Sequence, residues 1–162
     1  MRTLQEPGLA PLTDKDRDAM RLQHIPYRVQ LLEDAVRRIP AQTCQDNQAF
    51  EAGVVSGRIL LSFLGVGYDA KTRRLKEDRN HKPTEQMTDD VKVRDVGGSF
   101  VELDELPEIE AAVLVRFIHG AHKACAHFTI DSDHELNVPT YRQAVPIILR
   151  LLRQCLANKV EL

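Results

Sequence analysis

The side chains best suited to chemistry in this sequence lie in one short segment, residues 116–128 (RFIHGAHKACAHF). On a helix with about 100° between residues, four nitrogen-bearing side chains of this segment share one stripe: Arg116, His119, Lys123 and His127. The stripe contains no carboxylate, and like charges one turn apart destabilise a helix unless an anion is near. It therefore predicts an anion-binding surface, with His122 at its border.

Two side chains of an earlier segment are expected to extend and support this site. Residues 46–64 are apolar around most of a helical circumference, and the polar positions form a narrow strip of Glu51, Arg58 and Ser62. Because an unpaired buried arginine is very costly, this strip is expected to face a polar pocket or an interface. We assign Arg58 to anion binding and Glu51 to support of the stripe.

The histidines also raise a metal-binding alternative. His119, His122 and His127 are followed by a second cluster of metal-ligand types at Asp131, Asp133, His134 and Glu135. These types suit zinc or iron, but the HxxxH spacing is absent, no cysteine stands in a ligand pattern, and the loop lacks the glycine and terminal glutamate of an EF-hand. We predict no metal and no cofactor, and a His/Asp metal-binding protein stays the second alternative.

The elements that must position these side chains are helices. Apolar residues recur at three- and four-residue spacing over 22–39, 46–64, 105–127 and 140–160. Residues 13–162 are thus predicted to form a single all-α domain, a four-helix antiparallel bundle, after a flexible N-terminal tail at 1–12. The helix at 46–64 is placed in the middle of the bundle, where four small residues let a neighbour approach closely: Ala49, Gly53, Ser56 and Gly57.

A polar insertion separates the second and third predicted helices. Residues 69–90 have no apolar period and are expected to form a surface connection. Its segment Lys71–Lys82 carries six basic and two acidic residues, a net charge of 6 − 2 = +4, and is either a solvated loop or an arm that contacts phosphate. Gly97-Gly98, between short β-type runs, predicts a small β-hairpin near 91–103.

Composition limits the functions open to the chain. Its 162 residues hold 22 basic and 24 acidic side chains, a net charge of −2, so any anion site must be local. Three cysteines without a CxxC pair signal neither a disulfide framework nor a zinc knuckle. No apolar stretch is long enough to span a bilayer, and the first 20 residues lack the apolar core of a signal peptide. We predict a cytoplasmic protein that does not contact membranes.

Two resemblances bear on function. The runs AFEAGVVSGRILLSFLG, VKVRDVGGSFVELDEL and HKACAHFT resemble a group of small bacterial helical proteins of unassigned function, over about residues 46–130. More remotely, Arg116 followed after five residues by His122 is similar to the Arg/His signature of the HEPN superfamily, whose members are helical bundles. That resemblance implies metal-independent RNA cleavage in a homodimer, of the toxin or defence type, with Arg116 and His122 as catalytic residues. His127, on the Arg116 face, is the alternative partner.

Two classes of function remain open at this point. The first is a noncatalytic module that dimerises and binds a partner, RNA or protein, with its Arg/His stripe in polar contact with Glu51 or Arg58. The second is a HEPN-like ribonuclease, in which a histidine moves protons at the ribose 2′-hydroxyl and the leaving 5′-oxygen while Arg116 offsets charge on the phosphorane. We favour the first, as a homodimer.

Overall fold

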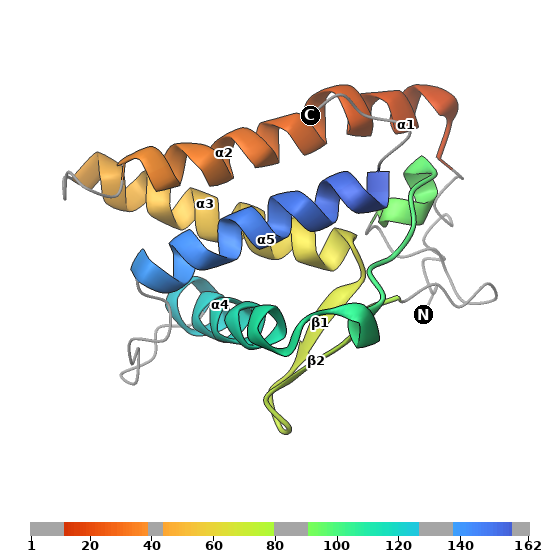
Figure 1. Cartoon of the computed structure of the whole chain (residues 1–162). Coiled ribbons are helices and arrows are strands. Elements are labelled where there is room, and N and C mark those ends of the chain that lie inside the picture. The colour runs from red at the N-terminus through yellow and green to blue at the C-terminus, as the bar shows by residue number, and fades with distance from the viewer. Residues whose placement is uncertain (1–11, 39–43, 80–90, 127–137, 157–162) are drawn as a thin grey trace, which may run out of the picture.

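The structure, a computed structural model, describes residues 12–38, 44–79, 91–126 and 138–156 (Figure 1). In chain order its elements are α1 (Asp14–Ala19), the π-helical turn η1 (Met20–His24), α2 (Ile25–Arg38), α3 (Cys44–Phe63), β1 (Val66–Asp69), β2 (Arg74–Glu77), the 3₁₀ turns η2 (Val93–Val96) and η3 (Leu103–Glu105), α4 (Glu108–Ala126) and α5 (Val138–Leu156). The predicted all-α bundle is confirmed, with one small two-stranded sheet among these residues. The tail predicted at 1–12 lies outside the described residues, except for Leu12.

The first helix begins eight residues earlier than its apolar spacing predicts. Thr13 caps it, because its hydroxyl accepts from the Asp16 backbone N–H while the Asp16 carboxylate accepts from the Thr13 N–H. Pro26 then lies inside the helix, where it lacks an N–H and crowds the preceding turn. Just before Pro26 the helix widens into the π-helical turn η1, in which the Ile25 N–H donates to the Met20 carbonyl five residues earlier.

Helix α3 occupies the centre of the bundle, as predicted. It contacts α2, α4, α5 and β1, and in Figure 1 it runs behind α5 and between α2 and α4. The small residues of α3 face its neighbours: a Cβ at Gly53 would come within 2.5 Å of the Ala35 Cβ, and one at Gly57 within 2.7 Å of the Phe117 ring. Gly65, with φ of 81°, ends the helix in the left-handed conformation.

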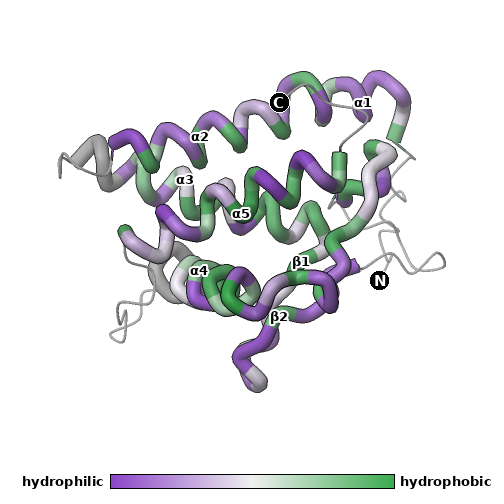
Figure 2. The backbone as a smooth tube through the Cα atoms, in the orientation of Figure 1, coloured by the Kyte–Doolittle hydropathy of each residue, from purple (hydrophilic) through white to green (hydrophobic). Residues whose placement is uncertain are grey.

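Two later helices close the core. Helices α4 and α5 lie side by side in Figure 1, and α5 buries an almost complete apolar side that includes Tyr141, Ile148 and Leu152. The Tyr141 hydroxyl crosses the core and donates to the Leu32 carbonyl of α2 at 2.8 Å. Figure 2 shows the complementary pattern on α2, whose outer side is hydrophilic. Buried apolar residues of all four long helices therefore form one core.

The β-hairpin lies elsewhere than predicted. Strands β1 and β2 pair antiparallel, with Tyr68 opposite Leu75 and Asp69 opposite Arg74, so residues 69–77 are not the plain surface connection expected for 69–90. The Asp69 carboxylate holds the turn by accepting from the Lys71 N–H and the Thr72 hydroxyl, each at 2.9 Å. The strands were not predicted because each has only four residues and the turn that joins them contains no glycine.

The hairpin predicted at 91–103 is wrong, and the described chain there forms the two 3₁₀ turns. Gly97 adopts φ of 83° to end η2, and its N–H and that of Gly98 return to carbonyls of the same turn. Arg17 and Arg21 of the first helix donate to the Asp95 and Val96 carbonyls at its end. The glycine pair thus serves a helical turn that the arginines fasten to the bundle.

Candidate functional site

The candidate site forms where the hairpin lies against α4. Tyr68 of β1 and His119 of α4 are joined by a hydrogen bond of 2.9 Å between the phenolic oxygen and Nδ1. The Tyr68 ring also meets the rings of His119 and His122 edge-on, with centroids 5.5 and 6.2 Å apart. All three side chains are half-buried. Tyr68 therefore fixes the orientation of one imidazole and packs on the other.

The hydrogen bond fixes the orientation of the His119 ring. Either Nδ1 accepts the Tyr68 hydroxyl proton and the neutral ring carries its proton on Nε2, or a protonated Nδ1 donates to the Tyr68 oxygen. Arg116, three residues earlier on the same side of α4, is exposed. A fixed imidazole beside an exposed guanidinium supplies directional donors and positive charge, which suits an oxyanion or phosphate oxygen.

Arg116 and His122 do not come together within one chain. Helix α4 runs unbroken from Glu108 to Ala126 through Gly120, so the two residues stay about 120° apart around its axis. The described pairing is His119 with Tyr68, not Arg116 with His122. A catalytic pair of the HEPN type would have to use residues of two chains.

Two members of the predicted stripe cannot be placed. Lys123 belongs to α4, but its side chain lies outside the described residues, and so do His127 and the acidic cluster at 131–135. Within the described ranges, no three histidine, cysteine, aspartate or glutamate side chains gather as a metal site would require. The metal-binding alternative thus gains no support from the described part of the chain.

The strip on α3 does not support the α4 stripe. Glu51 and Arg58 are both exposed, and in the described part of the chain neither forms a hydrogen bond or ion pair with α4. We expected a buried polar contact between these two residues and the α4 stripe, and this expectation is wrong. Helix α3 is continuous and points both side chains outward. Ser62, the third member of the strip, does enter a polar network.

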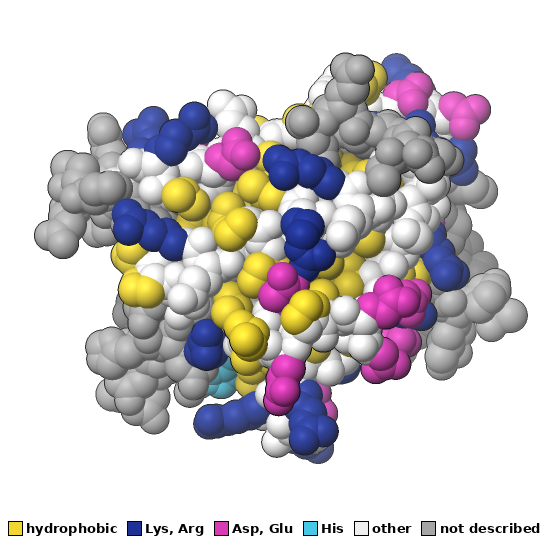
Figure 3. Space-filling model, in the orientation of Figure 1, with side chains coloured by type: hydrophobic (Ala, Val, Ile, Leu, Met, Phe, Trp, Pro, Cys, Tyr) yellow, Lys and Arg dark blue, Asp and Glu magenta, His cyan; other side chains and the backbone are white. Residues whose placement is uncertain are grey.

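Basic residues are concentrated on the hairpin that carries Tyr68, and those of β2 flank Leu75 and so point to the strand face opposite Tyr68. Strand β2 and the preceding turn carry Lys71, Arg73, Arg74 and Lys76, all exposed, against Asp69 and Glu77, a net charge of 4 − 2 = +2 over residues 66–77. Figure 3 shows Lys and Arg side chains at this lower end of the molecule, with a histidine just above them. The surface formed by α4 and the hairpin, residues 66–77 and 116–122, is called the α4–hairpin surface below.

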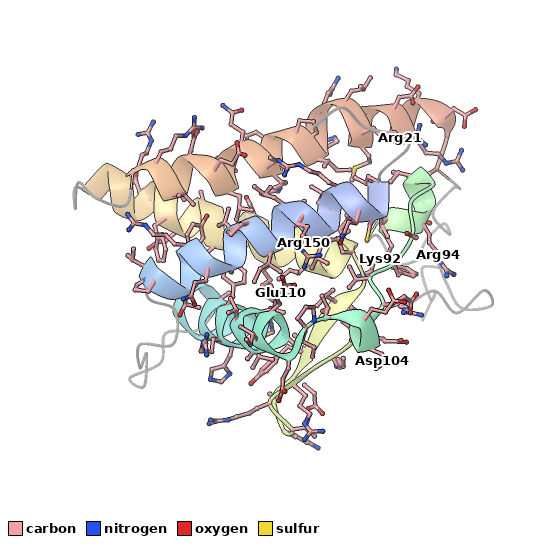
Figure 4. All side chains as sticks on the ribbon, in the orientation of Figure 1. Arg21, Lys92, Arg94, Asp104, Glu110 and Arg150 are labelled. Carbon is pink, nitrogen blue, oxygen red and sulfur yellow. The ribbon has the colours of Figure 1, made fainter. Side chains whose placement is uncertain are left out.

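A buried lysine anchors the base of the hairpin. Lys92 is only 3% exposed, and its ammonium donates to the Ser62 carbonyl at 3.0 Å, the Ser62 hydroxyl at 3.0 Å and the Asp78 carboxylate at 3.1 Å (Figure 4). The Ser62 hydroxyl in turn donates to Asp78 at 2.8 Å. Burial opposes the charge on Asp78, but the hydrogen bonds from Ser62 and Lys92 prevail and hold its pKa below the usual value.

All three ammonium protons have acceptors, so this network is structural. Lys92 places its charge on the Ser62 carbonyl in the last turn of α3, where the helix dipole favours a cation. Beside it, a groove of about 310 Å³ opens between the first helix and the end of α3, with Ser62 and Lys92 in its wall. The Ser62 hydroxyl donates to the Asp78 carboxylate, which is also paired with the Lys92 ammonium, so this carboxylate is stabilised as an ion-pair partner.

Two residues that organise these features, Tyr68 and Lys92, are not indicated as site residues by the sequence pattern. Tyr68 carried one signal, an aromatic residue directly after Gly67 and before a polar turn, which is compatible with a hairpin. The sequence gives no signal for Lys92. A lysine between two valines is not expected to be buried, and its partner Asp78 is 14 residues away in the chain.

Fold and site together define the class: a helical-bundle protein that carries a small β-hairpin and a Tyr–His pair beside exposed cations. Within the described residues, no helix combines the length and apolarity needed to cross a membrane. Comparison with protein-family models, curated proteins and solved structures gave no match to the chain. The function must therefore be argued from the surface itself.

Proposed function

We propose that this protein is a noncatalytic, homodimeric interaction module that binds RNA phosphates on its α4–hairpin surface. The single observation that carries the proposal is the Tyr68–His119 hydrogen bond of 2.9 Å, which orients an imidazole next to the exposed Arg116. Four exposed cations of the same hairpin add positive charge to this end of the molecule, with Arg74 and Lys76 on the strand face opposite Tyr68. Phosphate contacts of this kind dominate the affinity of proteins for nucleic acids.

The unbroken α4 favours binding over catalysis. General acid–base cleavage needs a histidine and a charge-stabilising group on the same phosphate, and within one chain Arg116 and His122 point in different directions. His119 is engaged with Tyr68, which suits a fixed donor. A HEPN-like ribonuclease is the second candidate, because the exposed Arg116 is accessible to a phosphate and a second chain can supply the histidine.

Fluorescence anisotropy with a short single-stranded RNA, in EDTA, tests the proposal on the full chain. We expect saturable binding whose log–log salt slope is about −0.7 per phosphate contact. Arg116→Ala and the pair Arg73→Ala/Arg74→Ala should weaken binding and flatten this slope. Arg153→Ala, an exposed arginine on α5, is the matched control and should leave binding unchanged.

Three outcomes separate the candidates. Binding with intact RNA supports the module, and RNA cut in EDTA by the wild type but not by His122→Ala supports the ribonuclease. An affinity that does not respond to any α4–hairpin substitution contradicts both. Tyr68→Phe adds a finer test, because it keeps the ring packing but removes the hydroxyl. If His119 must be held in place to bind RNA, this variant should bind RNA more weakly. Its free energy of unfolding should stay within about 1 kcal/mol of the wild-type value.

A further inference from the structure

The outer side of α3 exposes apolar side chains in the middle of a helix that is otherwise deeply buried. Val55 and Ile59 keep 40% and 41% of their surface exposed. With Gln48, Ala52 and Ser62 they form a stripe at spacings of four, three, four and three residues. This alternation is the pattern by which one helix packs lengthwise against another.

Two opposite charges flank this stripe on one edge. Glu51 lies four residues before Val55 and Arg58 three residues after it, and both are exposed. In the described part of the chain, neither side chain takes part in a hydrogen bond or an ion pair. The point midway between them falls between Val54 and Val55, close to the centre of the stripe, so a two-fold axis there would make the face complementary to itself.

We propose that the outer face of α3 is the homodimer interface, with α3 packed antiparallel to its counterpart across a two-fold axis near Val55. A two-fold axis perpendicular to α3 reverses the chain direction, so a residue before the axis meets one after it. Glu51 then meets Arg58 of the partner subunit, and the pair forms twice. Ala52 is small enough to let the two helices approach closely.

The α3 residues of this interface are distinct from those of the α4–hairpin surface. The interface rests on the proposed homodimer but not on RNA binding. The interface also explains why the apolar helix α3 carries a charged strip. It assigns Arg58 to subunit pairing in place of the anion binding expected from the sequence. The stripe is about 22 Å long, short for a standard interface, so neighbouring residues of α2 are expected to contribute and the affinity is expected to be modest.

Analytical ultracentrifugation of the full chain, over about 1 to about 100 µM, tests the interface. Glu51→Arg and Arg58→Glu each replace two attractive contacts by two repulsive ones and should raise the dimer Kd about tenfold. The double variant Glu51→Arg/Arg58→Glu restores opposite charges and should return Kd to near the wild-type value. Arg142→Glu, an exposed site on α5, is the control and should not change it.

The rescue by the double variant is decisive, because a variant that merely damages folding is not repaired by a second charge reversal. A wild-type dimer with this rescue supports the interface. A wild-type dimer that neither single variant weakens overturns the interface while leaving the homodimer intact. A chain that stays monomeric throughout overturns both, and RNA binding measured on the same samples remains an independent result.

Discussion

Replacing Lys92 by methionine tests whether the buried network holds the hairpin to the bundle. Methionine is unbranched and of similar length, so it fills the same space without the charge. The change removes three donated hydrogen bonds, of 3.0, 3.0 and 3.1 Å. Breaking a fully buried ion pair costs about 3–5 kcal/mol, but the Asp78 side chain is 26% exposed and keeps its bond from Ser62. We therefore expect a loss of about 2–3 kcal/mol in the free energy of unfolding.

The pH dependence of this loss identifies its cause. The pKa of Asp78 is lowered in the folded state, so its contribution is present above the unfolded pKa of about 3.9 and is lost as pH falls through the folded value. The difference between wild type and Lys92→Met should thus be largest near neutral pH and narrow below about pH 4. It should not vanish, because the bond to the Ser62 carbonyl does not titrate.

Urea denaturation followed by circular dichroism, at neutral and acidic pH, measures both effects. Lys71→Met, at an exposed turn position, is the matched control and should stay within about 0.5 kcal/mol of wild type. Combining Lys92→Met with Asp78→Asn should cost less than the sum of the single changes. A Lys92→Met variant as stable as wild type at neutral pH, or a deficit that does not shrink in acid, would refute the reasoning.

Three further substitutions test the fold, each by the same denaturation assay. Gly53→Ala should destabilise by about 1–3 kcal/mol although alanine favours helices, because its Cβ would come within 2.5 Å of the Ala35 Cβ; a gain in stability would contradict the α2–α3 packing. Tyr141→Phe leaves the buried Leu32 carbonyl without its 2.8 Å hydrogen bond and should cost about 1–2 kcal/mol; no cost would mean that water or another donor replaces it. Thr13→Ala removes the helix cap and should cost about 1 kcal/mol, with unchanged stability arguing against the capping box.

The sequence was most informative where the signal is local. Apolar spacing located all four long helices, and the end predicted for the second of them at residue 64 lies within one residue of the end of α3. The small residues Gly53 and Gly57 were also assigned correctly to close helix packing. Each of these inferences depends on residues within one or two turns of each other, which is the range over which periodicity acts.

The wrong predictions concern segments whose structure depends on tertiary contacts or on unusual turns. The turn between β1 and β2 places Arg73 at φ of 52°, a conformation that usually signals itself by glycine or asparagine. Conversely, Gly97-Gly98 supplies that signal but ends a 3₁₀ turn. The stripe on α4 was recognised, yet its partner Tyr68 lies 51 residues away in a hairpin that was not predicted. The polar strip on α3 was recognised too, but helical projection alone does not say which neighbour it faces.

The most direct test of the central claim is an NMR titration of the 15N-labelled full chain with a short single-stranded RNA. Binding through the α4–hairpin surface predicts saturable shifts that are largest for the backbone amides of residues 66–77 and 116–122, with the RNA recovered intact. It also predicts that Arg116→Ala reduces these shifts at equal RNA concentration. Absence of saturable shifts, or shifts concentrated on residues 48–62 of α3, would contradict the account.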